Sequence, residues 1–174
     1  DLSTLETTPE GRNQLVQARE WAVQEAQKAE PLRSIINPDA PEFYAGGNME
    51  KKIQDFCRRT NQPVPETIGQ VARCVYESLA LKYRHALEGL EKMKGQRIDS
   101  LNIVGGPINN KFLDQLIADA LDREVVTGPV EGAAIGNLLT QAMALGDIKD
   151  LDHLRQVVRN SESVETWTPN HTAA

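Results

Sequence analysis

The chain has 174 residues, which suits one globular domain or one part of a two-lobed protein. Its 40% hydrophobic and 25% charged residues are typical of a globular protein and exclude disordered, collagen-like and low-complexity chains. The 19 basic and 25 acidic residues give a net charge of -6. We therefore expect no nucleic-acid partner and no membrane partner, because binding to either phosphate backbones or anionic lipid needs clustered Lys and Arg.

Neither a membrane anchor nor a secretory signal is visible. No apolar run approaches the roughly 20 residues that span a bilayer, and the first residues lack a basic region followed by an apolar one, so we expect a cytoplasmic protein. Cys57 and Cys74 are too few for a disulfide framework and lack zinc-ligand spacing, so free thiols and no metal site built from this chain alone are expected. The start at Asp1 rather than Met is what a fragment, a processed product or an omitted beginning would show.

The first half of the chain reads as helices joined by an extended connection. Apolar residues at three- and four-residue intervals predict a helix over about 10–30, and Pro31, Pro38 and Pro41 indicate an extended segment after it. Asn48 is a typical N-cap for a short helix over about 49–60. An unbroken apolar stripe predicts a long helix over about 66–94. We interpret 1–47 as a leading helix and extended connection, and 48–95 as a helical hairpin.

The second half alternates between strands and helices. Residues 100–104 and 123–127 read as strands, each followed by a Gly-Pro-containing turn and then by a helix, over 109–122 and 130–145. The small residues of 130–145 suggest close packing of that helix on a sheet. A last helix over about 150–159, with Asp150 as its N-cap, and a short strand over 164–168 precede a polar tail, 169–174. Strand, turn and helix in duplicate predict an α/β fold, helix-rich with a few parallel strands.

The Gly-Gly turn in IVGGPINN, residues 103–110, is the sharpest local motif. A strand that ends in Gly105 and Gly106 and leads into a helix lets a ligand approach the backbone, and the free N–H groups of a helix start favour an anionic or polar one. The motif is neither a dinucleotide-binding G-x-G-x-x-G loop nor a Walker loop. Taken alone, the motif is weak, because a Gly-Gly turn between a strand and a helix more often has only a structural role.

Its wider context decides between these interpretations. The run from Ser100 to Leu151 resembles the C-terminal ATP-binding segment of the FGGY carbohydrate kinases, in which a strand, Gly-Gly, Asn and a helix with Gln and Ala-Asp are followed by Gly-Pro-x-Glu, small residues and Gly-Asn. Other segments are similar to the branch of that family that acts on L-rhamnulose. They are IINPDAPEF at 35–43, PVPE at 63–66, ARCVYESLALKY at 72–83 and RQVV at 155–158.

The resemblance implies an actin-like, ribonuclease H-like ATPase fold with two lobes and ATP in the cleft between them. This chain would be the latter part of the C-terminal lobe, with 96–168 as a βαβα ATP-binding segment. Gly105 and Gly106 would lie against the nucleotide, and Asn110 would face the adenine. Pro107 stands where the family usually has a small third residue, and proline has no N–H to offer the nucleotide.

The same resemblance implies that this chain alone is catalytically incomplete. The Asp general base, the phosphate loops and the magnesium ligands are expected outside it, so we assign it no catalytic residue and no metal ligand. The implied reaction is phosphorylation of L-rhamnulose at its 1-hydroxyl by ATP with Mg²⁺, the ketose being bound mainly by the rest of the protein. Another sugar or polyol, or a non-catalytic interaction domain, is the alternative.

The remaining polar candidates have simpler interpretations. Asp114 and Asp119 lie five apart, about 140° around a helix axis, and are expected on solvated faces or at caps. Glu131 would lie in the first turn of its helix, where the dipole favours a negative charge, with a supporting role near the cleft as the alternative. No catalysis is expected from the three histidines, and both tryptophans are expected in a core or between lobes. These residues are His85, His153, His171, Trp21 and Trp167.

Overall fold

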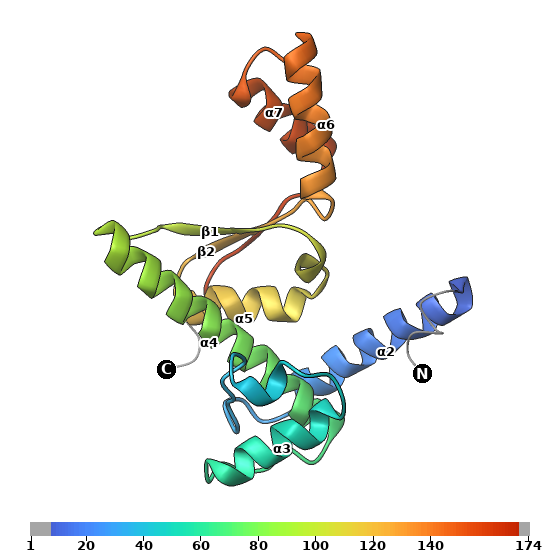
Figure 1. Ribbon diagram of the computed structural model, residues 1–174, viewed down its shortest axis with the longest axis vertical. Helices are drawn as coiled ribbons and strands as arrows, with labels where there is room; N and C mark the ends of the chain where they lie inside the picture. Colours follow the sequence, from blue (N-terminus) through green and yellow to red (C-terminus); the bar gives the residue numbers. More distant parts are fainter. Residues whose placement is uncertain (1–7, 171–174) are drawn as a thin grey trace. The chain divides into compact units, whose positions relative to one another are not determined.

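The computed structural model describes residues 8–170 and, within them, all side chains except those of 107 and 108 (Figure 1). Two compact units, Asp1–Lys82 and Tyr83–Ala174, divide the chain within its long helix. In chain order the elements are α2 (Pro9–Lys28), η1 (Pro41–Phe43), α3 (Met49–Arg59), α4 (Ile68–Lys94), β1 (Ser100–Ile103), η2 (Gly106–Asn109), α5 (Lys111–Leu121), β2 (Glu124–Thr127), α6 (Gly132–Leu145), α7 (Leu151–Ser161) and β3 (Glu165–Trp167).

Side-chain caps fix where several helices begin. Thr8 Oγ1 accepts from Gly11 N at 3.1 Å, Asn48 Oδ1 from Lys51 N at 3.0 Å, and Asp150 Oδ1 from His153 N at 2.8 Å. Each bond satisfies one of the free N–H groups of a helix start. The predicted caps Asn48 and Asp150 are confirmed, and every predicted helix is found within about two residues of its expected ends.

The core of the first unit joins α3, α4 and the extended connection. It contains Ile36, Ile53, Cys57, Val71 and Cys74, all buried. Both cysteines are free, and burial raises the pKa of the Cys57 thiol and that of Cys74, the latter to about 12. A buried thiol of this kind behaves as a small hydrophobic residue.

A glutamine side chain takes the place of a neighbouring strand for the extended connection. Gln62 Oε1 accepts from Ile35 N at 2.7 Å, and Gln62 Nε2 donates to Ile35 O at 2.8 Å. Ser78 Oγ accepts from the next amide, Ile36 N, at 2.9 Å. These bonds satisfy backbone groups that would otherwise be buried without partners, so a segment without regular structure can cover the core.

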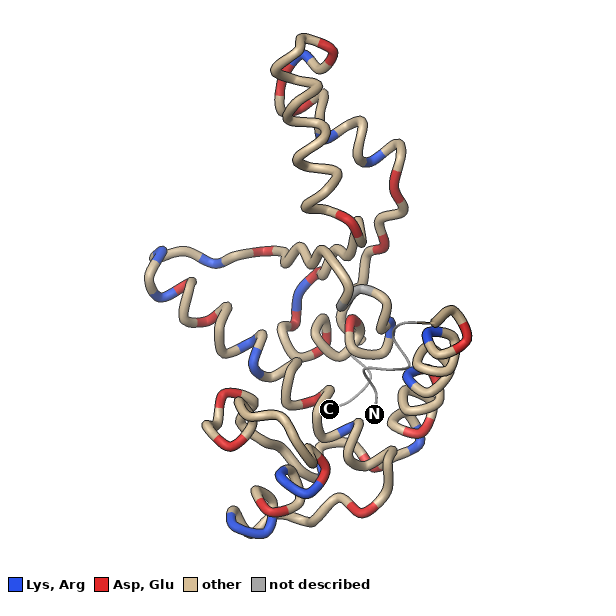
Figure 2. Tube along the Cα trace, turned by 45° about the vertical axis from the view of Figure 1, so that its right-hand side comes forward, with Lys and Arg blue, Asp and Glu red and all other residues tan. Residues whose placement is uncertain are grey.

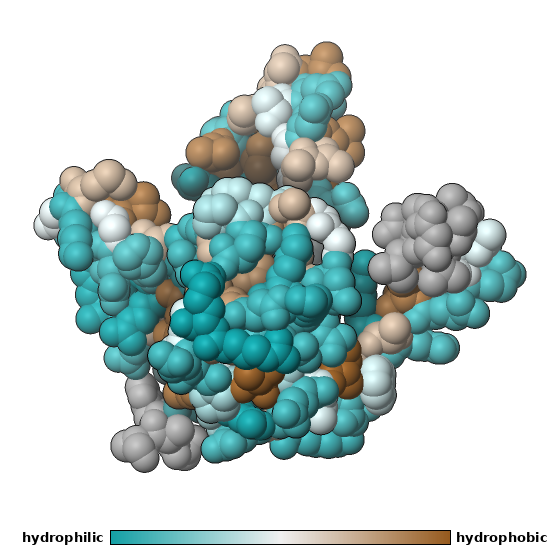
Figure 3. All heavy atoms as spheres, turned by 60° about the horizontal axis from the view of Figure 1, so that its bottom comes forward, coloured by the Kyte–Doolittle hydropathy of each residue, from teal (hydrophilic) through white to brown (hydrophobic). Residues whose placement is uncertain are grey.

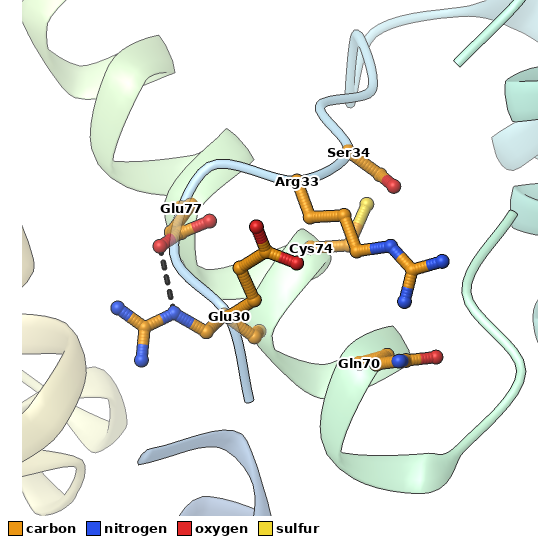
Figure 4. A pocket seen from close by; sticks show the side chains of 7 residues that line it. Glu30, Arg33, Ser34, Gln70, Cys74 and Glu77 are labelled. Carbon is orange, nitrogen blue, oxygen red and sulfur yellow. Dashed lines mark hydrogen bonds and ion pairs between the residues drawn. The ribbon is translucent and has the colours of Figure 1, made fainter. Parts of the chain in front are cut away.

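A buried ion pair on α4 holds the end of α2 and the turn that follows it (Figure 4). Glu77 Oε1 accepts from Arg73 Nε at 2.8 Å, and Arg73 Nη1 donates to Ala26 O at 3.2 Å. Glu77 Oε2 accepts from Leu32 N at 2.8 Å, which stabilises a left-handed backbone at Leu32, φ 53°. The hollow beside the pair measures about 10 Å³, room for one water rather than for a ligand.

Replacing Glu77 should destabilise the first unit strongly. Glu77→Gln removes the carboxylate that pairs with Arg73 on α4, and breaking such an ion pair costs about 3 kcal/mol. The measurement is the free energy of unfolding in urea. Glu88→Gln on the same helix removes an exposed partner of Arg84 and is the matched control, expected to leave the midpoint unchanged. Equal effects of the two substitutions would contradict this role for the pair.

The second unit is built on a three-stranded sheet in the order β1-β2-β3. β1 and β2 are parallel, as predicted, with Ser100 opposite Glu124 and Ile103 opposite Thr127. The strand predicted at 164–168 is β3, which runs antiparallel to β2, so the sheet is mixed rather than parallel throughout. The reason is that two helices, α6 and α7, separate β2 from β3. Two helices joined by a short loop lead the chain away from the sheet and back again, so β3 begins at the same edge of the sheet at which β2 ends.

Helix α6 differs from its expected role. It packs against α7, and none of its residues, all of them described, is buried, so its small residues do not bury it against the sheet as predicted. It carries no charged residue (Figure 2), and Leu138 and Leu145 are 67% and 81% exposed. Hydrophobic side chains lie among hydrophilic ones on the surface at the α6 and α7 end (Figure 3). Of the two glycines in α6, only Gly132 lies close to another segment, since a Cβ there would lie 3.3 Å from Val104 Cβ.

A second ion pair fixes the segment between α4 and β1. Glu91 Oε1 accepts from Ile98 N and from Arg123 Nη1, both at 2.6 Å, while Arg123 Nη1 donates to Ile98 O at 2.7 Å. The hydrogen bond from Arg123 is the main cause that lowers the pKa of Glu91. The pair therefore holds both polar backbone groups of Ile98 just before β1 begins.

The two tryptophans have different environments. Trp21, expected in a core or between lobes, is 53% exposed within the described residues. Trp167 is half-buried, and its Nε1 donates to Thr127 Oγ1 at 3.0 Å, which ties β3 to β2. Among residues 8–170, no helix is both long and apolar enough to cross a bilayer.

Candidate functional site

The turns after β1 and β2 meet at one edge of the sheet. Because the strands are parallel, their carboxyl ends lie together, which is where ligands bind in open α/β sheets. Gly105 N donates to Pro129 O at 3.2 Å, and Gly128 N donates to Ile103 O at 3.0 Å. The structure thus brings together the two Gly-Pro-containing turns that the sequence had singled out separately.

The two glycines of the first turn serve different needs. Gly105 has φ 90°, a left-handed backbone conformation that favours glycine. Gly106 is exposed, and a Cβ added there would meet nothing within 4 Å. The packing of this chain therefore does not require glycine at 106, and the open space beside it is compatible with a ligand lying against the backbone.

Asn110 is the N-cap of α5, and this role uses half of its side chain. Its Oδ1 accepts from Leu113 N at 3.1 Å, so the oxygen is engaged by the helix. The resemblance implies that Asn110 faces the adenine, and its Nδ2 hydrogens are the groups that could then donate to a ligand. Pro107 lies in η2, and as proline it offers no N–H to this turn.

Asp114 is buried, contrary to the expectation of a solvated carboxylate. It is 1% exposed, and neither of its carboxylate oxygens has a hydrogen-bond partner among the described residues. Its position on α5 explains the burial, because it belongs to a stripe with Leu113, Ile117, Ala118 and Leu121 that faces inward at helical spacing. That spacing is visible in the sequence and could have indicated the burial.

Burial is the main cause that raises the pKa of Asp114 to about 6, and the negative charge of Glu165 adds to it. Asp119 lies on the other side of α5, as the five-residue spacing predicts. Its exposed Oδ1 accepts from Gln115 Nε2 at 2.8 Å and from Asn170 N at 2.7 Å. The two carboxylates do not form a pair, so they are no candidates for joint acid and base catalysis.

The contacts of the other candidate groups do not indicate catalysis or ligand binding. Glu131 is the N-cap of α6, without a capping bond from its side chain. His153 Nδ1 accepts from Lys149 N at 3.2 Å, His85 is exposed, and His171 lies outside the described residues. Within residues 8–170, no three His, Cys, Asp or Glu side chains gather as a metal-binding group would.

With this geometry in place, comparison with known proteins defines the class. Residues 4–145 match the FGGY family of carbohydrate kinases, C-terminal domain. The chain belongs to this family.

Among its curated relatives are two rhamnulokinases. The chain is 43% identical over 152 residues to that of Bacteroides thetaiotaomicron and 42% identical over 146 residues to that of Bacillus subtilis. The matches cover 87% and 84% of this chain but 31% and 30% of those relatives. The chain therefore spans about a third of the length of the curated relatives that it matches.

Solved structures agree on the fold. A xylulose kinase from Rhodospirillum rubrum superposes with a TM-score of 0.60 at 21% identity, over 88% of this chain and 30% of that one. A Plasmodium falciparum glycerol kinase with ADP superposes with a TM-score of 0.60 at 17% identity, over 91% and 31%. The expected actin-like kinase fold is confirmed by these likenesses, which at such identities carry no information about the sugar.

The capping role of Asn110 predicts different effects for two substitutions. Asn110→Ala removes the cap and should lower the free energy of unfolding by about 1 kcal/mol, whereas Asn110→Asp keeps an acceptor at the cap and should change it little. Thermal or urea unfolding of the two variants measures the difference. If both variants unfold like the unsubstituted protein, the bond from Leu113 N does not stabilise α5.

Proposed function

We propose that this chain is the C-terminal portion of an ATP-dependent carbohydrate kinase that phosphorylates L-rhamnulose at its 1-hydroxyl. The observation that carries the family-level proposal is the open space beside Gly106, at the carboxyl edge of β1 and β2. The identity of 43% and 42% to two rhamnulokinases supports the choice of sugar. Another ketose or a polyol is the alternative, since xylulose and glycerol kinases have the same fold.

In this proposal the chain supplies the adenosine side of the ATP site. The Gly105–Gly106 turn lies against the nucleotide, and the Nδ2 hydrogens of Asn110 are donors for an acceptor on the purine edge. Pro107 has no backbone N–H to donate to the nucleotide, so we expect only van der Waals contact at that position. The residues present therefore suit a purine nucleoside better than a phosphate chain, which needs positive charge or clustered N–H groups.

The remaining parts of the reaction are assigned to the rest of the kinase. Mg²⁺ would neutralise charge on the phosphates, and a carboxylate base would take the proton of the sugar hydroxyl. We assign neither the magnesium ligands nor that base to this chain, and we place the ketose mainly against the part of the kinase outside it. A cytoplasmic location is part of the proposal, since ATP is the phosphate donor.

A bulky side chain at 106 should weaken nucleotide binding selectively. In the complete kinase, Gly106→Val adds a branched side chain to the open space, where its Cβ meets nothing within 4 Å. A steric loss of about 1–3 kcal/mol raises the Kd for ATP by roughly 5- to 150-fold, with the Kd for the sugar unchanged. Calorimetry with ATP and with L-rhamnulose measures both values.

The matched control for this substitution is Gly89→Val, because a Cβ at Gly89 on α4 also meets nothing within 4 Å. It should leave ATP affinity unchanged. Asn110→Asp provides a second test, since it keeps the helix cap and removes the Nδ2 donor. An unchanged ATP affinity in both Gly106→Val and Asn110→Asp would show that this edge of the sheet has only a structural role, as the interaction-domain alternative requires.

The chain by itself should not transfer phosphate. With L-rhamnulose, ATP and Mg²⁺ in a coupled assay, we expect no turnover, because the groups that position the phosphate and the sugar are assigned to the rest of the kinase. Turnover above about 0.1 per second, a tenth of the low end of kinase rates, would contradict the assignment. Other ketoses and glycerol in the same assay of the complete kinase test the choice of sugar.

A further inference from the structure

Asp114 has a buried titratable carboxyl group and lies one helical turn after Asn110 of the candidate nucleotide turn. Its backbone N–H donates to Asn110 O at 3.0 Å, so its main chain forms the first turn of α5 together with the proposed adenine-facing residue. Its carboxyl group is buried with the inward-facing stripe of α5, and both oxygens lack a partner among the described residues. The mechanism proposed above makes no use of this group.

The surroundings of Asp114 favour its neutral form. β2 packs against α5, and its buried residues, Val125 and Thr127, cannot ionise. β3 contributes Glu165, whose negative charge opposes ionisation, and α5 itself contributes Lys111, whose positive charge favours it. Lys111 Nζ is engaged with Glu165 Oε1 at 2.7 Å, so the cation is shared. A carboxylate buried without its own partner carries a large desolvation cost.

The expected pH dependence follows from the direction of the shift. The pKa of Asp114 is raised from 3.8 to about 6 in the folded protein, so the folded state binds a proton more tightly than the unfolded one. The stability that this proton contributes is present at low pH and is lost as the pH rises through about 6. Above that pH α5 holds a buried charge or must loosen to admit water or Lys111.

We propose that Asp114 is a pH-sensitive positioning residue for the nucleotide turn. With its carboxyl group protonated, α5 packs on β2 and β3 and holds Asn110 and the Gly105–Gly106 turn in place. With the group ionised, the first turn of α5 loosens and nucleotide affinity falls. The part that concerns nucleotide rests on the function proposed above, whereas the part that concerns α5 does not.

Hydrogen exchange read by mass spectrometry tests the response of α5 without any nucleotide. The protein, Asp114→Asn and Asp119→Asn are compared at pH 5 and pH 8, with exchange times corrected for the intrinsic rate. For a pKa of about 6, the protection of the amides of α5 should fall about tenfold more in the unsubstituted protein than in Asp114→Asn. Asp119→Asn, which changes an exposed carboxylate on the same helix, should behave like the unsubstituted protein. The amides of α3 are the internal control.

Equal falls in the unsubstituted protein and Asp114→Asn, or an α5 that is unprotected in both, would overturn the proposal. The second measurement is ATP affinity of the complete kinase over the same pH range, with the Asp114→Asn kinase as reference because the titration of ATP itself is common to both. The Kd should rise up to about tenfold more in the unsubstituted kinase. If ATP binds with the same pH dependence in both, the coupling to the turn is overturned. If neither kinase binds ATP while the exchange difference is present, the proposed function fails and the assignment of α5 stands.

Discussion

The register between β1 and β2 determines where every group of the candidate site lies. Ile103 pairs with Thr127, so the residues that follow each strand leave the sheet at the same edge and on neighbouring paths. The two turns then hydrogen-bond to each other through Gly105 and Gly128. A shift of this pairing by one residue would turn every side chain of the strand to the opposite face and separate the two turns. The segments that carry the family motifs therefore depend on a very small sheet.

Local features of the sequence were sufficient to predict most elements. Apolar spacing located the helices, and Asn48 and Asp150 marked two of their starts, because a cap and its helix lie within a few residues of each other. Features that depend on distant parts of the chain were not predictable in the same way. The direction of β3 follows from the packing of α6 on α7, and the packing of α6 away from the sheet is set by contacts that residue composition does not encode.

The candidate site shows the same division between local and distant information. The sequence identified Gly105, Gly106 and Asn110 through a motif, and the structure adds that Asn110 also serves its own helix. One side chain thus meets two requirements, a cap for α5 and a donor for a ligand, and only variants that separate its oxygen from its nitrogen can tell the two apart. The burial of Asp114 follows from the apolar residues of its own stripe, and its spacing from Asp119 carries no information about it.

Helix α6 has few contacts to protect it, although it carries part of the family motif. Because none of its residues is buried, opening it should require much less free energy than opening the strands that precede it. A protease that cuts mobile segments would meet this helix early, but the enzyme chosen matters. The sequence from Gly132 to Leu145 contains no Lys or Arg, so trypsin has no bond to cleave there, whereas chymotrypsin can act at its leucines and at Met143. A digest with trypsin alone would report this helix as resistant however often it opens.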